Sequence, residues 1–355
     1  MGRTKAAIQG WWVQNGSAAG QPLEEGLCRI GSPLYLVDRG GNLSAETGGF
    51  VQLGDAAPAA GAMPLVGHAM PVLPGQLGDA EFCAELGIRY PYIGGSMAKG
   101  ISSAAMAEEL GRGGMLGFFG AAGLPFTEVE AAVDRLKGSL GEIPFGFNLI
   151  HSPHEPDLEE ALVTLYLNKG IHLIEASAFL ALTPTLVRYR VHGISRMADG
   201  TIYAPNRIIA KVSREELAAR FFSPPPEKLL KELVAVGEIT AEQAELAGHI
   251  PLAQYVTAEA DSGGHTDNRP ALALFPTIHS LAKRLEKEFG YTCRLKVGLG
   301  GGISTPASAA AAFAMGADYI VTGSVNQACV ESGTSDTVRE MLTETRQADV
   351  TMAPA

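Results

Sequence analysis

A polar run in the second half of the chain, EADSGGHTDNRP at residues 259–270, places one histidine beside paired glycines. It follows the apolar segment 255–258, which is typical of a strand. Gly263 and Gly264 free the backbone, so the imidazole of His265 can reach a site at the strand end. An imidazole titrates near neutral pH and can donate a proton or hydrogen-bond to a developing anion. A lone histidine is also often structural, and both interpretations stay open at this point.

Two glycine-rich strand ends farther along the chain indicate a phosphate site. Gly300, Gly301 and Gly302 end one apolar run, in GLGGGISTP, just before a helix-start signal. Gly323 and Ser324 end the next run. Small residues let backbone N–H groups approach an anion, and the dipole at a helix N-terminus favours it. The loops after the last two strands of (β/α)8 barrels often bind phosphate in this way.

Two other strand ends are candidates for contacts with a ligand. The segment YIGGSMA ends one apolar run with Gly95, Ser96, Met97 and Ala98. It predicts either a backbone-lined surface for a flat ring, with Met97 as a soft contact, or a plain glycine turn before a helix. Asn148 ends the run FGFNLI, and its amide either binds a ligand, which we favour, or caps the next turn.

Other polar residues give weaker signals. Lys211 ends the run RIIAKVS and either points into the site or neutralises a nearby carboxylate. HSPHEP at residues 151–156 is a proline-bounded loop rather than a helical metal pair, so we expect no metal. Arg188, Arg190 and Arg196 form a basic cluster in an acidic chain. Such a cluster is usually a solvated face, but it could receive a phosphopantetheine carrier or a nucleotide phosphate.

The elements that must position these residues follow one pattern. Eight short apolar runs alternate mostly with helical segments from about residue 91 onward, which is the pattern of an α/β fold, a (β/α)8 barrel. An open doubly wound sheet is the main alternative. The runs are YPYIGG, GGMLGFFG, IPFGFNLI, IHLIEAS, RIIAKVS, YVTAEAD, LKVGLGGG and DYIVTGS.

The chain divides into a small first part and a large barrel. We expect residues 1–62 to form a small β-containing segment, because LYLVDRGGNLSAET predicts a hairpin about Gly40 and Gly41. Residues 63–355 then form the barrel domain. A predicted helical hairpin at residues 223–250 is inserted between the fifth and sixth strands. As an insertion on a βα loop it should lie over the barrel mouth, either as a substrate lid or as extra surface packing.

Composition restricts the partners and the compartment. The 355-residue chain has a formal net charge of −11, which disfavours nucleic acid as the main partner. Its four cysteines form no CxxC pair, which fits a reducing compartment. It contains no signal-peptide pattern and no run of about 18 apolar residues, so we expect a cytoplasmic protein with no membrane span. A homodimer is the commonest oligomeric state of cytoplasmic proteins that form oligomers.

Taken together, several of these sequence segments resemble one protein family. RYPYIGGSMAKGISS, FGFNLIHSP, APNRIIAKVS, EADSGGHTDNRP and VGLGGGISTPASAAAAFAMGADYIVTGS are similar to the PfaD-type trans-acting enoyl reductases of polyunsaturated fatty acid and trans-acyltransferase polyketide assembly lines. These belong with the flavin-dependent nitronate monooxygenase and type II enoyl-ACP reductase barrels. The resemblance runs from about residue 80 to the end. Members usually continue beyond the TMAPA ending, and the first 60 residues match only loosely.

The resemblance implies a cofactor, a site and an activity. It implies an FMN-binding barrel with His265 in catalysis. Lys211 falls in a family-like box and is the second candidate catalytic residue, although the resemblance assigns it no particular role. The implied cofactor-binding residues are Gly95, Ser96, Met97, Ala98, Asn148, Gly264, Gly300, Gly301, Gly302, Gly323 and Ser324. NADPH would be the co-substrate, and the substrate an enoyl thioester on an acyl carrier protein. The alternatives are a nitronate monooxygenase, a non-catalytic flavin-binding assembly subunit and a phosphate-sugar isomerase barrel.

Overall fold

The computed structural model describes residues 10–15, 21–54, 57–58, 60–263, 267–349 and 351. Contacts divide the chain into two units, Met1–Leu77 and Gly78–Ala355. The division therefore falls after Leu77 and not after residue 62. The physical reason is that β5 (Met63–Ala69) pairs with strands of the first unit, so it cannot belong to the barrel.

The first unit is built on an antiparallel sheet of five strands in the order β3-β2-β5-β1-β4. The predicted hairpin about Gly40 and Gly41 is confirmed, with Leu34 opposite Thr47 and Arg39 opposite Asn42. Sequence analysis missed the remaining strands. The unit consists of β1 (Gly10–Val13), α1 (Leu23–Leu27), β2 (Leu34–Arg39), β3 (Asn42–Thr47), β4 (Phe50–Leu53), β5 and the short 3-10 turn η1 (Pro74–Gln76).

The second unit contains a closed barrel of eight parallel strands in the order β12-β13-β14-β15-β6-β7-β8-β9. Pairing of β15 with β6, from Ile320 opposite Tyr92 to Thr322 opposite Gly94, closes the sheet. An open doubly wound sheet is thereby excluded, and all eight predicted strands are confirmed. The strands are β6 (Tyr92–Gly94), β7 (Leu116–Phe119), β8 (Phe145–Ile150), β9 (Leu173–Ser177), β12 (Arg207–Val212), β13 (Tyr255–Glu259), β14 (Lys296–Gly300) and β15 (Tyr319–Thr322).

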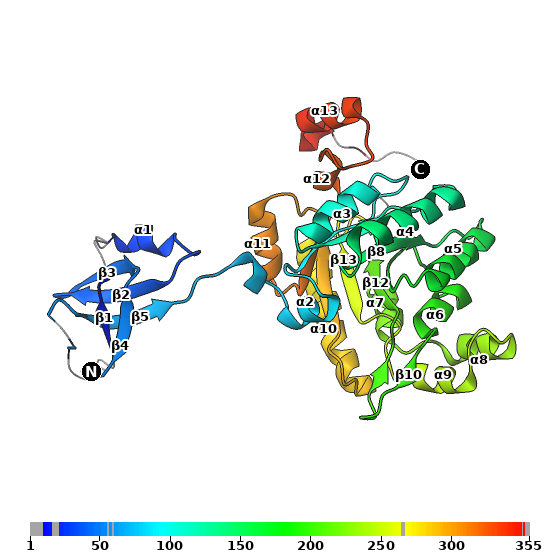
Figure 1. Ribbon diagram of the computed structural model, residues 1–355, viewed down its shortest axis with the longest axis horizontal. Helices are drawn as coiled ribbons and strands as arrows, with labels where there is room; N and C mark the ends of the chain where they lie inside the picture. The colour runs from blue at the N-terminus through cyan, green and yellow to red at the C-terminus, as the bar shows by residue number, and fades with distance from the viewer. Residues whose placement is uncertain are drawn as a thin grey trace. The chain divides into compact units, whose positions relative to one another are not determined.

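A helix follows each barrel strand, and Figure 1 shows these helices around the outside of the sheet. Apolar side chains from strands and helices form one continuous core between the two layers. The helices of this unit are α2 (Ala80–Leu86), α3 (Ala104–Arg112), α4 (Phe126–Leu140), α5 (Pro156–Asn168), α6 (Pro184–Val191), α7 (Glu215–Phe222), α8 (Glu227–Ala235), α9 (Ala241–Ala247), α10 (Ala271–Phe289), α11 (Pro306–Ala314), α12 (Ser324–Gln327), α13 (Asp336–Glu344) and the 3-10 turn η2 (Gln347–Asp349).

Helix α2 closes the amino end of the barrel. Its Phe82 is fully buried and stacks on Tyr319 with the ring centroids 4.4 Å apart. Phe82 also meets Tyr255 edge-on at 5.4 Å. Tyr255 and Tyr319 begin β13 and β15, so this aromatic cluster fills the interior where the strands start. Only the carboxyl end of the barrel is left for a ligand.

The inserted hairpin lies away from that end. Helices α8 and α9 form as predicted, but they follow α7, which itself begins just after β12. Both pack on α6, and α9 also contacts β10 (Ser195–Arg196), which pairs with β11 (Ile202–Tyr203). Among the described residues, none from α8 or α9 lines the cavity at the carboxyl end of the barrel, and α6, α8, α9 and β10 gather in one region of Figure 1. The prediction that the hairpin covers the barrel mouth was therefore wrong, and no lid comes from it.

None of the helices in the described parts of the chain has the length and hydropathy that a membrane crossing requires.

Candidate active site at the carboxyl end of the barrel

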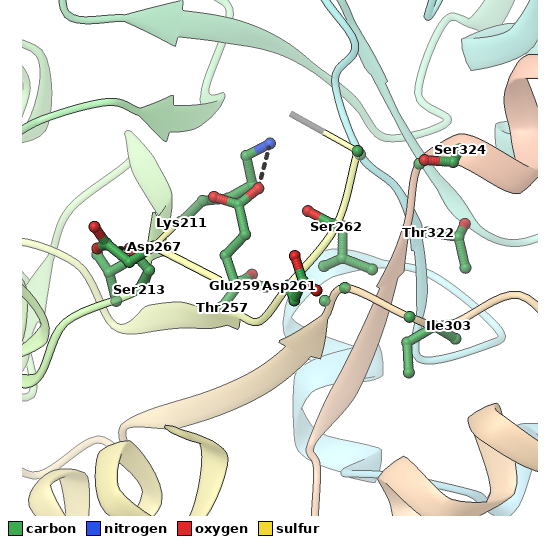
Figure 2. Close-up of a pocket in the computed structure, with 18 of the residues that line it drawn as sticks. Lys211, Ser213, Thr257, Glu259, Asp261, Ser262, Asp267, Ile303, Thr322 and Ser324 are labelled. Carbon is green, nitrogen blue, oxygen red and sulfur yellow. Dashed lines mark hydrogen bonds and ion pairs between the residues drawn. The ribbon is translucent and has the colours of Figure 1, made fainter. Parts of the chain in front are cut away.

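A cavity of about 1130 Å³ opens at the carboxyl end of the barrel. Its walls come from the ends and following loops of β6, β9, β12, β13, β14 and β15, and Figure 2 shows some of the residues that line it. Ligand pockets commonly measure about 300 to 1,000 Å³. The cavity therefore has room for a cofactor and part of a substrate together.

The structure brings most of the predicted site residues to this one cavity. Those that line it are Gly95, Ser96, Met97, Lys211, Gly300, Gly301, Gly302, Gly323 and Ser324. Ala98 does not line it. Gly264 and His265 lie outside the described residues, although Gly263 and Asp267, on either side of them, both line the cavity.

Asn148 does not reach the cavity either. It lies on β8 and is buried, and its amide nitrogen donates to the carbonyl oxygen of Glu175 at 3.2 Å and to the hydroxyl of Ser177 at 3.0 Å. The amide therefore ties β8 to β9. The contact of Asn148 with a ligand that we favoured stays a prediction.

The glycines after β14 and β15 leave open space that a compact anion could fill. Gly301 has a φ of +90°, and a Cβ there would lie 2.5 Å from the carbonyl oxygen of Ala260, so this position requires glycine. Gly302 has a φ of +72°, and a Cβ there would meet nothing within 4 Å. A Cβ on Gly323 would meet only the Cγ of Met97, at 4.0 Å. The residues present therefore fit a phosphate held by backbone N–H groups.

Glu175, which sequence analysis did not single out, organises the floor of the site. It is fully buried near the end of β9. Its Oε2 accepts hydrogen bonds from the backbone N–H of Ser96, at 2.7 Å, and from the Ser96 hydroxyl. Within the described residues its Oε1 has no hydrogen-bond partner. The sequence did contain a signal for Glu175, a carboxylate within the mainly apolar run IHLIEAS. A charge is rarely buried without a partner, so its presence there indicated a paired polar group.

Lys211 lies between two carboxylates at the wall of the cavity. Its Nζ is 3.4 Å from Oε1 of Glu259 and 3.7 Å from Oε2 of Glu175, and Figure 2 shows Lys211 and Glu259 pointing toward one another. Burial by itself lowers the pKa of this ammonium, but the carboxylates of Glu175 and Glu259 together raise that pKa above its ordinary value. Lys211 therefore stays a cation at neutral pH.

A second ion pair fixes the far end of the loop after β13. Arg214 donates two hydrogen bonds of 2.7 Å to the carboxylate of Asp267, and the Ser213 hydroxyl donates a third at 2.5 Å. These bonds from Arg214 and Ser213 lower the pKa of Asp267 well below its ordinary range. The backbone N–H of Asp261 also donates to the carbonyl of Arg269 at 2.9 Å. The loop that carries His265 is thus held at its base and to the end of β12.

The predicted basic cluster of Arg188, Arg190 and Arg196 does not form an exposed patch. Arg190 is buried, and its guanidinium donates to the carbonyl oxygens of Asn206 and Pro251. Arg188 is also buried and pairs with Glu238 at 2.9 Å. Only Arg196 is exposed among the three. The cluster therefore stabilises the α6 region and offers no patch for a carrier or a nucleotide.

The chain is similar to parts of proteins of polyunsaturated fatty acid and polyketide biosynthesis. No model of a protein family matches the chain. One of the proteins that make up the polyunsaturated fatty acid synthase of Thraustochytrium sp. is 47% identical over 358 aligned residues, covering 99% of this chain and 23% of that protein. The polyketide biosynthesis protein PksE of Bacillus subtilis is 45% identical over 280 residues, covering 79% of this chain and 36% of that protein. The chain thus spans well under half the length of these relatives.

A solved structure agrees with these relatives. The enoyl reductase domain of MlnA, from the macrolactin biosynthesis cluster of Bacillus amyloliquefaciens, superposes with a TM-score of 0.74 at 43% sequence identity. The match covers 76% of this chain and 61% of that one. The chain is therefore a homologue of these proteins, and its resemblance to the PfaD-type (β/α)8-barrel proteins is confirmed.

Proposed function

We propose that this protein is a trans-acting enoyl reductase of a polyketide or polyunsaturated fatty acid assembly line. It would reduce the α,β-double bond of an enoyl thioester on an acyl carrier protein, with NADPH as co-substrate and FMN as the bound cofactor. The observation that carries the proposal is the 43% identity, at a TM-score of 0.74, to an enoyl reductase domain. The family alone would not be sufficient, because one barrel supports many chemistries.

The cavity supports a role for FMN. The backbone of Gly301, Gly302, Gly323 and Ser324 would hold its phosphate, and the segment Gly95–Met97 would line one side of its ring. When bound, FMN supplies the transfer of hydride from the nicotinamide to the β-carbon of the acyl chain. The protein supplies orientation, exclusion of water and electrostatic stabilisation.

Reduction of the double bond adds a hydride at the β-carbon and a proton at the α-carbon. We assign the proton to His265, or to a water that it positions, because an imidazole near neutral pKa suits proton transfer. Asp267, two residues later, lines the cavity and is fixed to Arg214, which supports a position for this loop beside the substrate.

The test uses the full chain, loaded with FMN, and a crotonyl thioester of pantetheine or of a carrier protein. NADPH-dependent formation of the butyryl thioester, followed by mass spectrometry, is the expected result. His265→Ala should lower kcat at least a hundredfold, in line with the loss of a proton donor. His68→Ala, in the first unit, is the matched control and should leave kcat unchanged. A protein that binds FMN but forms no butyryl thioester would instead be a monooxygenase, if its reduced flavin recovers only with oxygen, or a non-catalytic component.

A further inference from the structure

Ser96, Glu175 and Lys211 form a cluster at the floor of the cavity whose members come from three separate strand ends. Ser96 follows β6, Glu175 lies in β9 and Lys211 in β12. Glu175 joins the other two, because its Oε2 accepts from Ser96 and lies 3.7 Å from the Nζ of Lys211. The position of the lysine is thus coupled to the loop after β6.

The ammonium of Lys211 keeps hydrogen-bonding capacity for a ligand. A strong charge-assisted N–H···O bond has a length of about 2.7 to 2.9 Å. Its two carboxylate partners lie at 3.4 and 3.7 Å, outside that range. An ammonium has three donors, and this one lines the cavity with 14% of its side chain exposed. The carboxylates therefore hold the charge in place without using its donors at short range.

The chemistry of this cation suits stabilisation of charge better than transfer of a proton. A general acid works best when its pKa is close to the operating pH. The two carboxylates raise the pKa of Lys211, so the group holds its proton too tightly for that task. A fixed cation that points at an oxygen on which negative charge develops stabilises that charge.

We propose that Lys211 is a catalytic residue that donates a hydrogen bond to a ligand oxygen that becomes negatively charged during reduction, and that Glu175 is its positioning residue. This inference rests on the proposed function and deepens it. Two sources supply such an oxygen, the thioester carbonyl as it becomes an enolate and a ring carbonyl of the reduced cofactor. Both present the same chemistry to Lys211, and two measurements distinguish them.

The first measurement is a redox titration of the FMN-loaded protein, which gives the ratio of its affinities for reduced and oxidised FMN. If the cofactor is the source, Lys211→Met should lower this ratio at least tenfold, which corresponds to about 30 mV for a two-electron couple. The second measurement is binding of an acetoacetyl thioester of pantetheine, whose enolate mimics the charged substrate. If the substrate is the source, Lys211→Met should weaken this binding at least tenfold. Lys211→Arg should restore most of either loss.

Lys296 is a matched control for a buried lysine. It lies in β14 at the closed end of the barrel, is fully buried and pairs with two carboxylates, those of Asp79 and Glu81. Lys296→Met should lower thermal stability and change neither measurement. If Lys211→Met fails to fold because it leaves Glu175 buried without a cation, the double variant Lys211→Met/Glu175→Gln removes both charges and gives the same two measurements.

The role of Glu175 is tested against Glu259, which also lies beside Lys211. Glu175→Gln and Glu259→Gln each remove one negative charge next to the ammonium, but only Glu175 also holds Ser96. A pure charge effect would strengthen binding of an anion in both variants. A positioning role predicts that Glu175→Gln weakens this binding and lowers kcat with little change in KM, because the neutral amide accepts weaker hydrogen bonds from Ser96 than the carboxylate does. Glu259→Gln should strengthen the binding.

Two results would overturn the inference. The first is a folded Lys211→Met protein in which both measurements stay within twofold of the parent. The second, which concerns Glu175 alone, is identical behaviour of the two glutamine variants. Failure of the proposed function gives a different signature, because the parent protein itself would then lack flavin or fail to reduce the crotonyl thioester. A parent that binds FMN without reducing the thioester still allows both measurements.

Discussion

Ser96 donates its backbone N–H to Oε2 of Glu175 at 2.7 Å, and this bond joins the loop after β6 to the end of β9. Strands β7 and β8 lie between β6 and β9 in the closed sheet. Among the described residues, no loop after β7 or β8 lines the cavity. The bond therefore closes the cavity on that side and sets the position of the segment proposed to face the flavin ring.

Ser96→Ala tests this link. The variant keeps the backbone bond but removes the hydroxyl that also donates to Glu175. A hydrogen bond to a charged group contributes about 1.5 to 3 kcal/mol, so the free energy of unfolding of the barrel should fall by about that amount. Urea unfolding followed by far-UV circular dichroism measures it, since both tryptophans, Trp11 and Trp12, lie in the first unit.

A matched variant separates stability from ligand binding. Ser139→Ala removes a hydroxyl that donates to the buried carboxylate of Glu108 at 2.9 Å, far from the cavity along the chain. Both variants should lose stability, but only Ser96→Ala should weaken FMN binding. Equal FMN affinities for the two variants would contradict a role for Ser96 in the site.

The phosphate loop is tested by adding a negative charge. Ser324 is exposed at the first position of α12 and lines the cavity, so Ser324→Asp should fold normally. Its carboxylate should repel the phosphate and lower FMN affinity at least tenfold, as measured by fluorescence titration of the apoprotein. Thr127→Asp adds the same charge in the first turn of α4 and serves as the control. Unchanged affinity for Ser324→Asp would place the phosphate elsewhere.

The glycine pair after β14 gives a prediction about stability. Gly301→Ala has two destabilising features, a φ of +90° and a Cβ 2.5 Å from a carbonyl oxygen. Gly302→Ala has only the backbone strain of a φ of +72°. We expect a loss of about 1 kcal/mol for Gly302→Ala and about 2 to 4 kcal/mol for Gly301→Ala, as measured by urea unfolding. Equal losses would mean that the close approach to Ala260 does not exist in solution.

The ion pair of Asp267 predicts a dependence of stability on pH. Arg214 and Ser213 lower the folded-state pKa of this carboxyl, so the unfolded state binds a proton more readily. The resulting stability is present above the unfolded value of about 3.9 and is lost as pH falls through the lower folded pKa. Asp267→Asn should therefore be less stable than the parent at pH 6, and the difference should shrink below about pH 4.

Urea unfolding at several pH values measures this difference. Asp134→Asn breaks an ion pair in which the Asp134 side chain is 60% exposed, and it should change stability by less than about 0.5 kcal/mol. A loss for Asp267→Asn that is the same at pH 3 and pH 6 would contradict the assignment.

Sequence patterns were sufficient for the barrel because its strands are short, buried and separated by helices with clear caps. The first unit was harder, because β1 pairs with β4 and β5, which lie far away in the chain. Pro64 lies within β5 opposite Trp11, although proline is unusual inside a sheet. Local patterns carry no information about such distant pairing.

The residues of the candidate site were likewise predicted only in part. The glycines after β14 and β15 and the lysine of β12 were found because strand ends meet at one rim of a parallel barrel. Glu175 was missed because its partner Ser96 lies in the loop after β6, which comes next to β9 only when the barrel closes. The inserted hairpin was misplaced because α7 already fills the connection after β12, which sends α8 and α9 to the other end.

Anaerobic stopped-flow spectroscopy of the FMN-loaded protein tests the central claim most directly. NADPH is mixed in first and the flavin absorbance is followed, and then the crotonyl thioester is added. We predict that NADPH bleaches the flavin and that the thioester restores its absorbance without oxygen. A flavin that bleaches but recovers only with oxygen would contradict the enoyl reductase and indicate a monooxygenase, and a protein that binds no flavin would contradict the whole account.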